Sequence, residues 1–173
     1  MGTRSHLGDL EMITPALADF FSAHGDAHLV TFLGKHAPKA LKGFRNITHR
    51  PTLKWPAFRR FMADSAWHAA LAPMRETPVN RARSFNKLLD HASVGAVGLY
   101  SAAACPAIAR AVRHGMHGLH VKAHAHDWLD ALEYLYHNRE HARKMAQKGA
   151  EQARVLGNPE RCRQFWMKEL SIS

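Results

Sequence analysis

Apolar residues recur at helical spacing in several separate segments of the chain. In Asp9–His24 the large apolar side chains fall on one face, which predicts an amphipathic helix. In His126–Arg154 the same spacing continues for much longer, and a break is expected near His137-Asn138. The other predicted helices are Ala57–Met62, Ser84–Ser93, Ala107–His114 and Glu160–Leu170.

Short apolar runs bounded by glycine or proline lie between these helices and predict β-strands. The predicted strands are Ala27–Leu33, Ile47–His49, Ala66–Ala72, Ala96–Tyr100 and Leu119–Val121. Strands that alternate with helices favour an α/β fold, here a Rossmann-like open parallel sheet with helices on both faces. We expect one domain over residues 1–173, whose closing helix, 160–170, docks on a further domain outside this chain.

The segment from Trp67 to Val121 is one strand-loop-helix-strand unit. Its first apolar run ends at Pro73, a basic loop follows, and the next helix carries Lys87 and Asp90. Such units place loops and helix starts along one edge of a parallel sheet, where phosphate-bearing ligands bind. The preceding unit lacks its first strand, because only Met1 stands before Gly2-Thr3. We therefore expect either a chain cut just before this turn or a sheet edge that another chain covers.

Composition narrows the class of protein and of partner. The chain has 173 residues, 46% of them hydrophobic, which is enough for one hydrophobic core. Its formal net charge of +10 favours anionic binding partners. Cys105 and Cys162 fit no metal-ligand spacing and are expected to be reduced. Without a signal peptide or a spanning apolar run, we expect a cytoplasmic protein, with peripheral attachment to the inner face of a membrane as a variant.

Several motifs together resemble the C-terminal, donor-nucleotide-binding domain of retaining glycosyltransferases with the two-domain GT-B fold, the group 1 type. The resemblance covers nearly the whole chain. Its motifs are Gly2-Thr3 with His6 and Asp9, 71–74, Thr77-Pro78, 80–84, 87–90, 114–119 with Asp127-Trp128, and 138–145.

The resemblance implies roles for two positions around the helix of Lys87. The family has two glutamates separated by seven residues; the second, which holds the ribose hydroxyls of the donor, falls on Asp90. Aspartate can accept the same two hydrogen bonds, although it is about one methylene shorter. The first glutamate, which contacts the donor sugar, falls on Ala82, where this chain has no carboxylate.

Elementary chemistry adds further candidates for a nucleotide-sugar site. Lys87, three residues before Asp90, can neutralise diphosphate charge from the same helix face. Arg83 and Ser84 can add donors beside the free N–H groups of the helix start. Backbone N–H groups of the Gly2-Thr3 turn can approach a phosphate closely. The remaining candidates for the pocket are His6, Arg75 and Asn80. The alternative interpretation is a solvated Lys-Asp pair on a surface helix.

The many histidines are expected to be surface residues rather than a metal site. The run His114, His117, His120, His124 and His126 crosses a turn, a strand and a loop, which supplies no tetrahedral set of ligands. We therefore predict no metal and no cofactor. The aromatic residues Trp128, Tyr134, Tyr136, Phe165 and Trp166 have helical spacing, which favours core packing or domain docking over base stacking.

The hypothesis from sequence is therefore a glycosyltransferase donor domain. It binds a nucleoside-diphosphate sugar, and transfer to a glycan or lipid-linked acceptor requires an N-terminal acceptor domain or a partner chain. The purified chain alone is expected to transfer nothing. Two alternatives stay open: a non-catalytic partner subunit, which includes a homo-oligomer, and a basic nucleic-acid-binding module, the less favoured of the two. No catalytic residue is assigned.

Overall fold

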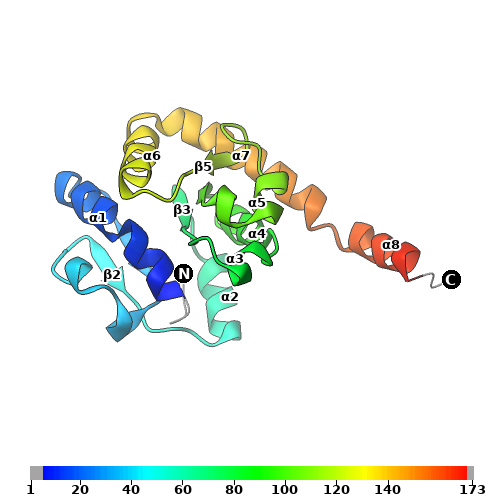
Figure 1. Cartoon of the computed structure of the whole chain (residues 1–173), viewed down its shortest axis with the longest axis horizontal. Helices are drawn as coiled ribbons and strands as arrows, with labels where there is room; N and C mark the ends of the chain where they lie inside the picture. Colours follow the sequence, from blue (N-terminus) through cyan, green and yellow to red (C-terminus); the bar gives the residue numbers. More distant parts are fainter. Residues whose placement is uncertain (1–5, 171–173) are drawn as a thin grey trace.

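The elements of the computed structural model, which describes residues 6–170, alternate between helices and strands (Figure 1). The helices are α1 (Leu7–Ala23), α2 (Trp55–Ala63), α3 (Pro78–Arg81), α4 (Asn86–Ser93), α5 (Pro106–Ala111), α6 (Ala125–His137), α7 (Arg139–Leu156) and α8 (Pro159–Glu169). The strands are β1 (Leu29–Thr31), β2 (Ile47–His49), β3 (Ala69–Ala72), β4 (Val97–Tyr100) and β5 (Gly118–His120). Three short 3₁₀ turns, 34–36, 39–41 and 102–104, lie between them.

All strand pairs are parallel, which confirms the predicted α/β class. The strands form two sheets: β1 pairs with β2, and β3, β4 and β5 pair in that order. Among the described residues, β1 and β3 do not pair with each other, so the two sheets lie on either side of an interval.

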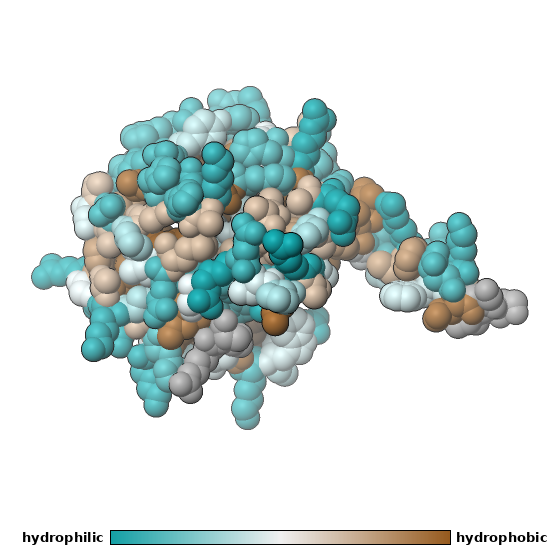
Figure 2. All heavy atoms as spheres, in the orientation of Figure 1, coloured by the Kyte–Doolittle hydropathy of each residue, from teal (hydrophilic) through white to brown (hydrophobic). Residues whose placement is uncertain are grey.

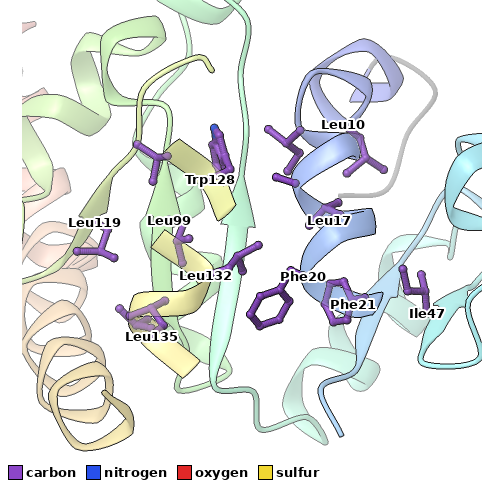
Figure 3. Packing of buried hydrophobic residues seen from close by; sticks show 14 of the residues in the cluster. Leu10, Leu17, Phe20, Phe21, Ile47, Leu99, Leu119, Trp128, Leu132 and Leu135 are labelled. Atoms are coloured by element: carbon purple, nitrogen blue, oxygen red, sulfur yellow. The ribbon is translucent and has the colours of Figure 1, made fainter. Parts of the chain in front are cut away.

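The two faces of the central strand β4 build two cores. Val97 and Leu99 point to the side of α1 and α6, where the largest buried side chain is Trp128 (Figure 3). Gly98 and Tyr100 point to the opposite side, which α4, α5 and the last turns of α7 cover. This alternation is the period of two expected of a strand that is buried on both faces.

Tyr100 needs two glycines beside it. A Cβ atom on Gly98 would overlap the Tyr100 hydroxyl and ring, and one on Gly118 would meet the Gly98 carbonyl and the same ring. Gly118 also has φ +150°, a conformation that residues with a side chain rarely adopt. The two glycines thus make room for a large, fully buried aromatic side chain at the sheet surface.

Helix α8 extends away from the rest of the described chain (Figure 1). None of its residues is buried, and apolar atoms lie on its surface in Figure 2. Phe165 and Trp166 are 54% and 58% exposed, unlike Trp128, which is fully buried in the core. Within residues 6–170, no helix is long and apolar enough to cross a membrane.

Candidate functional site

A cleft lies between β1 and β3, bounded by the start of α1 and by one face of α4. Its polar lining residues are His6, His28, Thr31, Arg83, Lys87, Asp90 and His91. The rest of the lining is mostly apolar and includes residues 28–32 and most of 67–74. The cleft therefore joins charged groups near the carboxyl end of β3 to an apolar interval between two strands.

Lys87 and Asp90 lie one turn apart on α4, as predicted. Helix α4 begins at Asn86, so Lys87 is in its first turn, and its Nζ lies 2.8 Å from Asp90 Oδ2. The two side chains are 38% and 35% exposed, so solvent and ligands can reach both. Because each already has the other as a partner, Lys87 can contact an anion only if it shares or leaves the carboxylate of Asp90.

Asp9 is the buried centre of a network at the start of α1. Its Oδ1 accepts hydrogen bonds from the Arg75 N–H at 2.9 Å and from Asn80 Nδ2 at 3.4 Å, and His6 Nδ1 lies 3.2 Å from Oδ2. Burial opposes ionisation of this carboxyl, but the hydrogen bonds with His6, the Arg75 N–H and Asn80 outweigh it, so the pKa of Asp9 is lowered. The network ties α1 to the loop after β3.

Arg83 is held through Asn80. The Arg83 Nε donates to Asn80 Oδ1 at 2.8 Å, and Asn80 Nδ2 donates to the Arg75 carbonyl at 2.8 Å. Asn80 itself lies in α3, where its N–H donates to Oγ1 of the N-cap residue Thr77 at 3.1 Å. This short helix, which falls in a segment expected to be a loop, fixes the position of the guanidinium beside the cleft.

The structure brings some of the predicted site residues together and separates others. His6, Arg83, Lys87 and Asp90 line the cleft. Ser84 is exposed, precedes α4 instead of lying within it, and is not among the lining residues, so the predicted helix start is corrected by two residues. Arg75 and Asn80 also lie outside the lining and support it through Asp9. Gly2 and Thr3 are outside the described residues.

His91 and Tyr100 form a buried pair behind the charged residues of α4. Their rings stack with centroids 5.1 Å apart, and His91 Nδ1 and the Tyr100 hydroxyl have no hydrogen-bond partner among the described residues. Burial, followed by the nearby charge of Lys87, lowers the pKa of His91 to about 3. Burial, followed by the charge of Asp90, raises the pKa of Tyr100. Both side chains are therefore neutral at physiological pH, a feature that the sequence did not indicate.

The histidine run after β4 makes local contacts instead of converging. His120 lies next to the backbone, with Nε2 2.8 Å from the Val112 carbonyl, and His114 Nδ1 accepts a hydrogen bond from the His120 N–H. Over the described range 6–170, a different group could hold a metal ion: His24, Glu133 and His137, at the ends of α1 and α6. In the structure the Glu133 carboxylate pairs with both imidazoles, at 2.9 Å and 3.3 Å.

Comparison with known proteins gives a likeness in structure alone. The sequence matches no protein-family model and no curated protein. The structure is similar to the C-terminal domain of the group 1 family glycosyl transferase LpcC from Francisella tularensis, with a TM-score of 0.64 and 13% identity over 88% of this chain and 80% of that domain. It is also similar to HepE from Anabaena in complex with UDP-glucose, with a TM-score of 0.67 and 12% identity over 93% of this chain.

This chain has the fold of a GT-B half-domain. It spans 44% of the length of HepE, so it corresponds to less than half of that protein. In this fold Lys87 and Asp90 of α4 line the same cleft as the residues at the carboxyl end of β3. At 12–13% sequence identity the similarity shows the fold and does not identify a substrate.

Proposed function

We propose that this chain binds the nucleoside diphosphate of an activated sugar as the donor half of a glycosyltransferase. The observation that carries the proposal is the presence of Arg83, Lys87 and Asp90 in one cleft of a GT-B half-domain. A diphosphate requires cations and a ribose requires hydrogen-bond acceptors, and α4 offers both one turn apart.

Each residue has a separate task in this proposal. Lys87 exchanges its contact with Asp90 for the diphosphate, which frees the Asp90 carboxylate to accept from the two ribose hydroxyls. Arg83, oriented by Asn80 at 2.8 Å, adds a second cation on the same side. During transfer these cations stabilise the departing diphosphate, because preorganised charge acts most strongly where new negative charge develops.

The acceptor belongs to a second domain or partner chain in this proposal. The solvent-exposed Phe165 and Trp166 of α8 suit the docking of such a partner, because large aromatic side chains that bury little in their own domain are typical of interfaces. The purified chain then binds nucleotide but transfers no sugar, and detectable transfer by it would contradict this assignment.

The test is a comparison of two lysines. Binding of UDP, GDP and ADP is measured by calorimetry and by thermal shift for the wild type, Lys87→Ala and Lys148→Ala. Lys148 is the matched control, because it also pairs with an acid three residues later, Glu151, at 3.0 Å, but lies on α7 outside the cleft. We expect at least one nucleotide to raise the melting temperature of the wild type, and Lys87→Ala to weaken its binding about tenfold or more.

Two results would reject the proposal. One is the absence of binding by all three nucleotides at millimolar concentration. The other is equal weakening by the two lysine substitutions, which would indicate attraction to the net charge of +10 in place of a site. Tight binding of duplex DNA or RNA that falls steeply with salt and ignores free nucleotides would favour the nucleic-acid alternative.

A further inference from the structure

Two helices end beside one carboxylate, outside the cleft. Helix α1 ends with His24 as its C-cap, and α6 ends at His137, one turn after Glu133. His24 Nε2 lies 2.9 Å from both carboxylate oxygens of Glu133, and His137 Nε2 lies 3.3 Å from Oε2. Two imidazole nitrogens thus converge on a single carboxylate, and none of the three residues lines the cleft.

These three side chains are the ligand types that borderline divalent metal ions prefer. Imidazole nitrogens suit Zn²⁺, Co²⁺ and Ni²⁺, and a glutamate oxygen can join them, whereas Mg²⁺ and Ca²⁺ are bound by oxygen ligands. The three ligand atoms lie within 4.8 Å of one another. In the part of the chain that the structure describes, no other three histidine, cysteine or acidic side chains come this close. A metal ion therefore has one place there where three ligands meet.

The distances between the ligand atoms suit one small ion. Ligand atoms held at about 2.0–2.1 Å from a tetrahedral Zn²⁺ are about 3.3 Å from one another. The imidazole nitrogens of His24 and His137 are already 2.9 Å and 3.3 Å from the Glu133 carboxylate. The two nitrogens, which lie within 4.8 Å of each other, need to approach by up to about 1.5 Å. His137 is 65% exposed, so its side chain can turn to supply this movement.

His24 is held in place through both its backbone and its ring. Its N–H donates to the Phe20 carbonyl at 2.9 Å, and its carbonyl accepts from Asn46 Nδ2 at 3.1 Å. The centroid of its ring lies 4.7 Å from that of Phe20 and 4.0 Å from that of Tyr136. The Tyr136 hydroxyl in turn donates to Asp26 at 2.8 Å. Because this imidazole is fixed before an ion arrives, it loses little freedom when the ion binds.

The electrostatic surroundings favour a cation. Both α1 and α6 have their C-termini here, and the free carbonyls of a helix C-terminus carry a partial negative charge. Arg139, which begins α7, has its ion pair with Asp26 at 3.6 Å. Among the described ion pairs, those of Glu133 are with the two histidines alone. Within residues 6–170, no lysine or arginine therefore competes with a metal ion for this carboxylate.

We propose that His24, Glu133 and His137 bind one Zn²⁺ ion, or a divalent ion of the same class, and that water completes its coordination. A hydrogen bond between imidazole and carboxylate needs a proton on the nitrogen, whereas a metal ion needs the lone pair, so binding releases protons. The ion joins the end of α1 to the end of α6, the two helices that pack around Trp128. This site is separate from the cleft and does not depend on the proposed function.

Titration of the whole chain with Zn²⁺, after treatment with a chelator, tests the site. We expect the melting temperature to rise with Zn²⁺ and to stay unchanged with Mg²⁺ at the same concentration, because only an ion that binds the folded state stabilises it. Calorimetry should give one ion for each chain. By NMR, the ring nitrogen resonances of His24 and His137 should shift on saturation with Zn²⁺, while those of the exposed His126 should not.

Two substitutions remove ligands, and a third is the matched control. Glu133→Gln keeps the size of the side chain without its charge, and His137→Ala removes the exposed imidazole. Each should weaken Zn²⁺ binding about tenfold or more, because three ligands act together on one ion. His126→Ala is the control, since His126 is also exposed and lies 3.5 Å from the carboxylate of Asp127. It should leave the affinity for Zn²⁺ unchanged.

Three results would overturn the proposal. The first is a melting temperature that Zn²⁺ does not raise. The second is equal weakening of Zn²⁺ binding by all three substitutions, which would indicate adventitious binding to the 14 histidines of the chain. The third is the absence of a shift in the ring resonances of His24 and His137. If either ligand variant does not fold, the resonances of the wild type still decide.

Discussion

Replacement of His91 by phenylalanine should remove a large part of the pH dependence of stability. The imidazole is buried against Tyr100 and has a pKa of about 3, whereas the same group has a pKa of 6.5 when exposed. Phenylalanine keeps an aromatic ring against Tyr100 and cannot take up a proton. At neutral pH the substitution also removes a buried nitrogen that lacks a hydrogen-bond partner, so the variant should retain the fold.

The magnitude follows from proton linkage. The folded pKa is lowered, so the unfolded chain takes up a proton at His91 below about pH 6.5 while the folded protein does not until about pH 3. The stabilisation is present in full above pH 6.5 and is lost progressively as the pH falls. With about 1.4 kcal/mol for each pKa unit, the loss between pH 7 and pH 5 is about 2 kcal/mol.

Urea unfolding at pH 7 and pH 5 measures this difference. For a domain of this size, about 2 kcal/mol corresponds to a shift of roughly 1 M in the urea midpoint. The effect of the high positive charge at low pH is common to all variants and cancels in the comparison. His126→Phe is the control, because His126 is 72% exposed and should behave as the wild type. Equal losses in the wild type and His91→Phe would refute the reasoning.

Two further substitutions test the packing and the network around the cleft. Gly98→Ala should lower the free energy of unfolding by about 2–3 kcal/mol, because the added methyl overlaps the buried Tyr100 ring; Gly43→Ala, with open space around it, should change it by less than about 0.5 kcal/mol in the same urea titration. Asp9→Ala should lower the free energy of unfolding by about 1–3 kcal/mol, because the Arg75 N–H loses its acceptor. An unchanged free energy of unfolding in the same titration would show that solvent can replace this carboxylate.

The sequence predicted the helices better than the strands. The break near His137-Asn138 is confirmed by the ends of α6 and α7, because a long amphipathic pattern carries its own boundaries. The strand predicted over Ala27–Leu33 extends only over Leu29–Thr31. It is shorter because β1 pairs with a single three-residue strand, β2, among the described residues. Apolar character indicates that a strand is buried and leaves its pairing undetermined.

The candidate site was predictable where it depended on one helix. Lys87 and Asp90 share a face because of their spacing, and both line the cleft. The central position of Asp9 was not predictable, because two of its partners, Arg75 and Asn80, lie more than sixty residues later in the chain. The neutral state of His91 likewise results from burial beneath β4, which no local pattern encodes.

The sequence of the projecting helix α8 can change without affecting the packing of the two cores. Because α8 supplies no buried residue, substitutions of Phe165 or Trp166 change the exposed surface without removing contacts from either core. Mutations can therefore accumulate on this helix at little cost to folding, while the residues around β4 remain under selection for folding. If α8 docks the proposed acceptor domain, the choice of that domain can change through this helix alone.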